Sequence, residues 1–291
     1  MIRLTVLLIT LGVSTGIFGQ EAPRTGLLSR RYHEGEKLTY RMKGVNESWR
    51  YVIQATGIVK KDVAGKYIEE YAWSNLTSNG APFNLPPGSL EFRQILSLDP
   101  DQRPSIPNLA VVHPMLIGPI TDMLTFYADL WLATRTGQLT RAGDHVYQKL
   151  GVPASWADGN NVIIGEDSID FDITLKDVDG SNQVATLLIR HVPPAQPAVK
   201  LPAAWMREPV ADTPNNWVEV TKQGDKYVAA IGKQTFDVQM RVSLVEGKIL
   251  SGTIENPVKA KERDCNDAAL TNCGDPRPHA ILRQIEISLD R

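Results

Sequence analysis

Hydrophobic and polar residues alternate along most of the chain. The segment SIDFDITLKDV places Phe171, Ile173 and Leu175 on one face and polar or acidic residues on the other, and QTFDVQMRVSLV repeats the pattern. A period of two with one apolar face predicts antiparallel strands that cover a core on one side only. Similar segments throughout the chain predict about eleven strands.

Short polar stretches that contain glycine separate these strands in the C-terminal third. DVDGSN, KQGDK, Gly232-Lys233 and Glu246-Gly247 each lie between two alternating segments. Glycine at such places favours tight hairpin turns, because it adopts positive φ without steric cost. We therefore predict a meander of about five strands for this third of the chain.

One long apolar segment interrupts the strand pattern. It reads MLIGPITDMLTFYADLWLA and occupies residues 115–133. Pro119 suits the first turn of a helix, and Arg135 followed by Gly137 suits its end. These signals predict a helix over residues 119–135.

The polar residues of this predicted helix indicate whether it lies in a membrane or in a protein core. Asp122, Thr125 and Asp129 form one stripe on an otherwise apolar surface. Charged residues disfavour a membrane span, and an apolar helix with a single polar stripe is typical of burial. We therefore expect a mainly β fold, a large curved antiparallel sheet or half-open barrel, with the helix embedded in its concave side.

The first 19 residues, MIRLTVLLITLGVSTGIFG, have the features of a secretory signal peptide. Arg3 supplies a positive start, the following apolar run is too short to span a bilayer, and Gly19 suits cleavage. We expect an exported protein, periplasmic or secreted, whose mature residues 20–291 form a single β-rich domain. A proline-rich segment over 193–214 is predicted to be a rim loop, because prolines exclude a central strand or a helix.

The cysteine content and the charge each bear on the prediction. Cys265 and Cys273 are the only two cysteines, and in an exported chain such a pair predicts a disulfide. The chain carries 31 Lys and Arg against 33 Asp and Glu, and the basic residues are scattered. This distribution lacks the basic patch of a nucleic-acid-binding protein, so we expect no nucleic-acid partner.

The sequence carries no recognisable motif for catalysis, metal binding or a cofactor. The five histidines lie far apart from one another, so no local pair has metal-ligand spacing. We therefore expect no cofactor and no metal, and a non-enzymatic protein in preference to an enzyme.

Aromatic residues are the best candidates for ligand contacts. Trp49 and Tyr51 share one face of a predicted strand, Tyr71 and Trp73 share one face of the next, and Trp131 lies on the predicted helix. Such a group can line a pocket for an apolar ligand or stack on sugar rings. Ordinary cross-strand packing in a core is the alternative.

Arg283 falls in the apolar row of the last predicted strand. That row consists of Ile281, Ile285, Ile287 and Leu289. Because an isolated buried charge costs several kcal/mol, Arg283 needs a partner, and the natural ones are Asp122 or Asp129 on the helix. Two alternatives remain: Arg283 extends to water at a strand end, or it holds an anionic ligand head group.

One short stretch resembles a known family. YHEGEKLTYRM, residues 32–42, is similar to the first strand of some relatives of the bacterial lipoprotein-localisation carriers, a group that includes uncharacterised periplasmic proteins. The strand pattern with one embedded helix also resembles their half-open β-barrel. The resemblance implies a concave apolar surface that shelters acyl chains or another hydrophobic ligand. The chain is longer than the carriers by the proline-rich loop and the cysteine-closed hairpin.

Three functions are compatible with these observations. The first is an exported non-enzymatic protein that binds a hydrophobic or amphipathic ligand, such as a lipid, in the concavity of the sheet. The second is an extracytoplasmic carbohydrate-binding or hydrolytic protein that uses the aromatic residues and the carboxylates of GEDSIDFD, including Asp170 and Asp172. The third is a structural or adaptor protein.

Overall fold

The computed structural model describes residues 26–151, 155–158, 161–164, 168–192, 203–213 and 215–290. One sheet of fifteen strands contains all the strands of this part, and every pairing in it is antiparallel. The strands are β1 (Lys37–Asn46), β2 (Trp49–Lys61), β3 (Tyr67–Ser78), β4 (Ala81–Pro82), β5 (Gln94–Leu96), β6 (His145–Gly151), β7 (Ser155–Asp158), β8 (Asn161–Ile164), β9 (Ser168–Asp179), β10 (Val184–Val192), β11 (Trp217–Gln223), β12 (Lys226–Gln234), β13 (Phe236–Ser243), β14 (Ile249–Cys265) and β15 (Arg277–Leu289). The mainly β, open-sheet prediction is confirmed, with β4, β6, β7 and β8 as additional strands.

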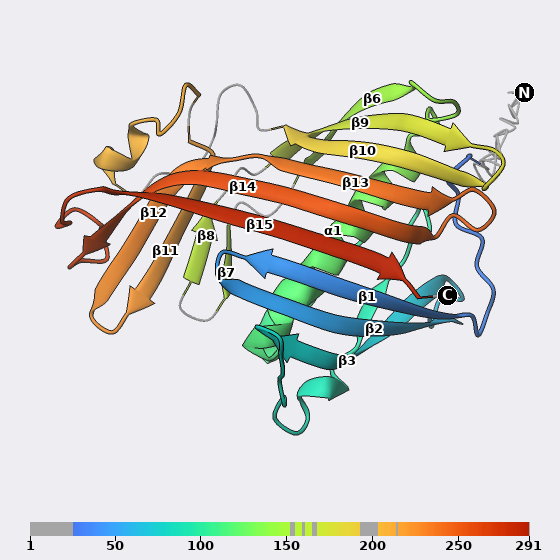
Figure 1. Ribbon diagram of the computed structural model, residues 1–291, viewed down its shortest axis with the longest axis horizontal. Helices are drawn as coiled ribbons and strands as arrows, with labels where there is room; N and C mark the ends of the chain where they lie inside the picture. Colours follow the sequence, from blue (N-terminus) through green and yellow to red (C-terminus); the bar gives the residue numbers. More distant parts are fainter. Residues whose placement is uncertain are drawn as a thin grey trace, which may run out of the picture.

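The larger part of the sheet, which we call the half-barrel, curves around the helix α1 (Pro114–Arg135) (Figure 1). Its strands follow the order β6-β9-β10-β13-β14-β15-β1-β2-β3, with β4 and β5 paired to the outer edge of β3. Residues that alternate inward from these strands pack with α1 into one large core, as the sequence pattern predicts. The inward residues Ile173, Leu175 and Met240 are fully buried.

The smaller part, which we call the extension, consists of β7, β8, β11 and β12 together with the far ends of β14 and β15 (Figure 1). β14 joins the two parts, because residues 251–255 pair with β13 and residues 258–265 pair with β12. The predicted hairpin turn at Gly232-Lys233 is wrong: β12 and β13 follow one another along the same edge of β14. Gly232 serves close packing there, since a Cβ atom would lie 2.3 Å from the carbonyl oxygen of Lys259.

The helix begins five residues before its predicted start, at Pro114, and ends at Arg135 as predicted. Its first turn is capped by His113, whose Nδ1 accepts a hydrogen bond from the backbone N–H of Met115 at 3.2 Å. Pro119 therefore lies inside α1, where the hydroxyl of Thr121 donates to backbone carbonyl oxygens of the same turn. Among the described residues, no helix combines the length and apolarity needed to cross a bilayer.

The disulfide between Cys265 and Cys273 is confirmed. It closes the loop between β14 and β15 at the end of the extension. Of the predicted rim loop, residues 193–202 and 214 lie outside the described residues, as does the predicted signal peptide. The described part of the loop forms a short 3-10 helix, Ala204–Arg207, and the indole N–H of Trp205 in it donates to the carbonyl of Leu270 at 3.0 Å.

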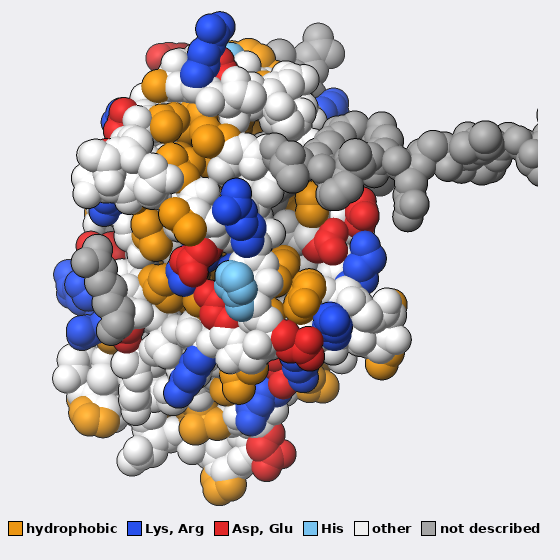
Figure 2. Space-filling model, turned by 90° about the vertical axis from the view of Figure 1, so that its right-hand side faces the viewer, with side chains coloured by type: hydrophobic (Ala, Val, Ile, Leu, Met, Phe, Trp, Pro, Cys, Tyr) orange, Lys and Arg blue, Asp and Glu red, His pale blue; other side chains and the backbone are white. Residues whose placement is uncertain are grey.

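The end of the half-barrel that carries the β13–β14 turn is closed by residues 26–36, which we call the N-terminal strap. Leu28 of the strap is buried in the main core, and the backbone N–H of Arg31 donates to the carbonyl of Glu246 at 2.8 Å. On this end of the molecule, charged side chains lie among small hydrophobic groups without forming one uniform patch (Figure 2).

Candidate ligand-binding core around α1

The predicted pairing of Arg283 with the helix is confirmed, and the partner is Asp122. The Arg283 guanidinium on β15 contacts Oδ1 of Asp122, while the Tyr51 hydroxyl on β2 donates to Oδ2 at 2.6 Å. The Asp122 side chain is almost fully buried. Burial raises the pKa of Tyr51, with the Arg283 charge acting in the opposite direction, so the phenol stays a hydrogen-bond donor at neutral pH.

Asp129, the other acidic residue of the stripe, has a different partner. Nε2 of His191 on β10 lies 2.9 Å from Oδ2 of Asp129. The imidazole stacks on Phe236 with ring centroids 4.4 Å apart and meets Phe171 edge-on at 4.6 Å. The three rings come from adjacent strands in direct register, so this side of α1 rests on an aromatic row with one polar contact.

A third polar cluster lies between α1 and β3. The Tyr71 hydroxyl donates to Oε2 of Glu69 at 2.9 Å and lies 2.6 Å from the Tyr127 hydroxyl, which also contacts Glu69. Nε of Arg30, from the N-terminal strap, lies 2.9 Å from Oε1 of Glu69. Both side chains of this ion pair are shielded from solvent. Burial, followed by the negative charge of Glu69, raises the pKa of Tyr71 and Tyr127 well above the ordinary value.

The same arginine continues the network toward the surface. Nη2 of Arg30 lies 2.8 Å from Oε2 of Glu36, and Nζ of Lys248 lies 3.2 Å from the other oxygen of that carboxylate. Burial opposes ionisation of Glu36, yet hydrogen bonds and charge from Arg30 and Lys248 lower its pKa. The strap is thus tied electrostatically to β3, to Lys248 just before β14 and, through Glu69, to α1.

Two glycines allow the tyrosines to reach α1. Tyr51 lies opposite Gly44, and Tyr71 lies opposite Gly57, on neighbouring strands. A Cβ atom at either glycine would overlap the ring of the tyrosine that lies across it, at 2.0 Å and 2.4 Å. Each ring therefore lies over bare backbone, a packing that compensates for glycine in a strand.

The structure brings most of the predicted aromatic residues together on the concave face. Tyr51, Tyr71 and Trp73 are buried there, and the half-buried Trp49 lies 5.2 Å from Tyr51 between ring centroids. Trp131 is also buried but lies elsewhere: its indole N–H donates to the carbonyls of Asp99 and Pro100 in the segment before α1. The aromatic residues of the sheet therefore surround the helix and do not form an exposed platform.

Two buried polar atoms of this core have no hydrogen-bond partner among the described residues. One is the indole Nε1 of Trp73 on β3, and the other is Oε1 of Gln94 on the adjacent β5. The amide nitrogen of Gln94 donates to the carbonyl of Ile120 in α1 at 2.9 Å, so this side chain contacts the helix directly. A donor and an acceptor left unpaired in an apolar core are costly, and such atoms are uncommon in folded proteins.

Two of the carboxylates proposed for the alternative function, Asp170 and Asp172, lie on the same face of β9. Asp172 contacts Nε2 of His145 on β6, and Asp170 is partly exposed on the same strand face. The side chains of residues 165–168 lie outside the described residues. Within the described ranges, no three His, Cys, Asp or Glu side chains are grouped closely enough to hold a metal ion.

Comparison of the chain with family models, with curated proteins and with solved structures finds no match.

Proposed function

We propose that this protein is an exported, non-enzymatic binding protein that takes up a hydrophobic or amphipathic ligand between the concave face of the sheet and α1. The observation that carries the proposal is the pair of unpartnered atoms beside the helix, Nε1 of Trp73 and Oε1 of Gln94. A ligand with one hydroxyl or carboxyl group and an apolar body would satisfy the donor or the acceptor and would replace apolar contacts of α1 with its own.

The way α1 is held supports this proposal. Apolar side chains such as Phe126 and Leu130 fill the concavity, so a ligand of any size has to share that space by moving the helix. Ligand uptake is then a population shift between a seated and a displaced α1, and its cost includes the polar contacts at Asp122, Asp129 and Tyr127.

Export of the protein is part of the same proposal. The disulfide between Cys265 and Cys273 is the kind of bond that persists in oxidising compartments. The sugar-binding alternative has less support, because Tyr51, Tyr71 and Trp73 face the helix and are unavailable for stacking on a surface ligand.

The test has two stages. Native mass spectrometry of the protein purified from its own source should reveal a bound lipid-like mass, and titration of the delipidated protein with a fluorescent fatty acid should give saturable binding. Trp73→Phe keeps an aromatic ring, although a smaller one, and removes the indole N–H, so it should change the affinity for a fatty acid more than the affinity for an alkane probe. Trp205→Phe, in the loop that packs against the extension, is the matched control.

Binding of neither lipid nor fatty acid by the wild-type protein would contradict the proposed function. Saturable binding that is unaltered by Trp73→Phe would place the ligand elsewhere on the molecule. The indole N–H of Trp73 would then have no role in binding.

A further inference from the structure

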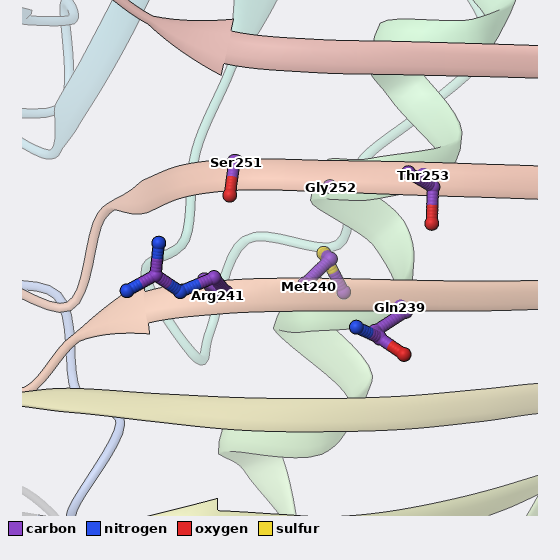
Figure 3. Close-up of a pocket in the computed structure, with 6 residues that line it drawn as sticks. All are labelled: Gln239, Met240, Arg241, Ser251, Gly252 and Thr253. Atoms are coloured by element: carbon purple, nitrogen blue, oxygen red, sulfur yellow. The ribbon is translucent and has the colours of Figure 1, made fainter. Parts of the chain in front are cut away.

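The convex face of the half-barrel carries two shallow cavities that meet over β14. Their volumes are about 90 Å³ and about 210 Å³. Ser251, Gly252 and Thr253 line both of them, Arg241 lines the first, and Arg41 lines the second. Figure 3 shows the first cavity, with Ser251 and Arg241 on adjacent strands and α1 behind the sheet. We call the two cavities together the convex trough.

The strand register determines which polar side chains lie next to one another in the trough. One row across four neighbouring strands reads Arg241, Ser251, Ser288 and Arg41, each residue directly opposite the next. At about 4.8 Å between strands, the two arginine backbones lie roughly 14 Å apart, with two short hydroxyl side chains between them. The neighbouring row, Gln239, Thr253, Glu286 and Lys43, adds an amide, another hydroxyl and an ion pair.

Two ion pairs lie beside the trough, and neither involves Arg41 or Arg241. Lys43 pairs with Glu286 at 3.2 Å, and Arg190 pairs with Asp237 at 3.2 Å. Neither Arg41 nor Arg241 has a hydrogen-bond or ion-pair partner in the part of the chain that the structure describes. Both guanidinium groups are exposed, so their five N–H donors each are available to a ligand.

A β-bulge at the trough adds a second, independent observation. Arg241 pairs with Ser251, but the next residue, Val242, pairs with Ile249, so that Leu250 has no opposite residue. Bulges redirect the side chains beside them and are common next to functional sites. This one lies directly beside the arginine and the serine that line the first cavity.

We infer that the convex trough is a binding site for a tetrahedral oxyanion, a phosphate or sulfate group, held by Arg41 and Arg241 from two sides and by hydroxyls of Ser251, Thr253 and Ser288 from below. Guanidinium groups bind such oxyanions with paired N–H donors, and hydroxyl groups donate to the remaining oxygens. The site lies on the opposite face of the sheet from the core around α1, so it is independent of the proposed function.

Titration of the full mature chain with inorganic phosphate, followed by backbone amide chemical shifts, tests the inference. We expect saturable shifts centred on residues 251–253 with a Kd of about 1 mM or tighter. Arg41→Gln and Arg241→Gln should each weaken binding about tenfold, because each removes a charge-assisted contact. Arg207→Gln, which changes an exposed arginine in the 3-10 helix of the rim loop, should leave the affinity unchanged and controls for net charge.

A second experiment distinguishes a phosphate group on a lipid from a phosphate group on a soluble ligand. Vesicles of phosphatidylglycerol that bind the wild-type protein, and release it when inorganic phosphate is added, would assign the site to a lipid headgroup. Phosphate binding without vesicle binding would assign it to a soluble ligand, and both results support the site. Phosphate shifts that are absent, that lie away from residues 251–253, or that persist in the double arginine variant would overturn the inference.

Discussion

The half-barrel and the extension share two strands, β14 and β15, but they are stabilised in different ways. In the half-barrel, a large apolar core surrounds α1 and encloses ion pairs such as Arg30 with Glu69. In the extension, the cores are small, with one disulfide and exposed ion pairs such as Arg277 with Glu262 and Asp264. The same two strands thus run through one region that is stabilised mainly by a large core and another in which a disulfide supplements small cores.

This difference has a physical reason. Hydrophobic stabilisation grows with the apolar area removed from water, so a large core can offset the desolvation of buried charges, while a small one cannot. Buried ion pairs add little net stability but penalise wrong arrangements, because each misplaced charge is left unpaired. In the half-barrel they fix where α1 and the N-terminal strap lie. The extension carries no α-helix among its described residues and is instead closed by a covalent bond.

The largest expected effect is at the buried ion pair of the half-barrel. Arg30→Ala should lower the free energy of unfolding by about 3–5 kcal/mol, because it leaves the Glu69 carboxylate buried without its cation. Urea denaturation followed by circular dichroism measures the change. Arg277→Ala, in the extension, removes an exposed arginine with a similar number of carboxylate contacts and should leave the unfolding midpoint nearly unchanged. Equal effects of the two substitutions would remove the contrast between the regions.

A somewhat smaller effect is expected where the last strand meets the helix. Arg283→Ala should cost about 2–4 kcal/mol, since Asp122 loses its cation but keeps the hydrogen bond from Tyr51. In a double-mutant cycle, Asp122→Asn should reduce the cost of Arg283→Ala by at least about 1 kcal/mol. Strict additivity of the two substitutions would show that the ion pair does not contribute to stability.

Arg283 also shows what the sequence can reveal. A charged residue in the apolar row of a strand needs a partner on the buried side, and this argument predicts the contact with the helix. The same argument applies to Glu69, in the row of Tyr71 and Trp73, and to His191, in the row of Ile189. Both were missed as partners of the helix and the strap, although the signal is present in the sequence.

Other features had signals in the sequence that were ambiguous or absent. The start of α1 was missed because Pro119 resembles a first-turn residue, whereas His113 and Pro114 form the actual start. The turn predicted at Gly232 was wrong because glycine serves both tight turns and close backbone approach, and only the neighbouring strand decides between them. Arg30 could not be placed, because its partners come from distant segments of the chain.

Alkaline pH should weaken the half-barrel through its buried tyrosines. Burial raises the pKa of Tyr40, Tyr51, Tyr71 and Tyr127 above the ordinary value of about 10. The folded state therefore holds protons that the unfolded state releases, so this stability is complete below about pH 10 and is lost as pH rises further. Unfolding measured at about pH 8 and about pH 11 should differ strongly in the wild-type protein and less in Tyr51→Phe. Equal pH slopes for the two proteins would contradict this.

The smallest effect is expected at the disulfide of the extension. The bond closes a short loop, so the chain-entropy estimate of its stabilisation is about 2.5 kcal/mol at most. Replacing both cysteines with serine should lower the melting temperature by only a few degrees and should leave the near-ultraviolet signal of the half-barrel intact. A double variant that fails to fold would mean that the extension is required for the half-barrel to form.

The most direct test of the proposed ligand core is titration of a fluorescent fatty acid into the wild-type protein and Arg283→Gln. If the contact with Asp122 keeps α1 seated, weakening it increases the population in which α1 is displaced, so the apparent Kd should fall by roughly tenfold or more. Arg277→Gln should bind as the wild type does. An unchanged Kd, or a loss of binding that would show Arg283 holding an anionic head group, would contradict the account.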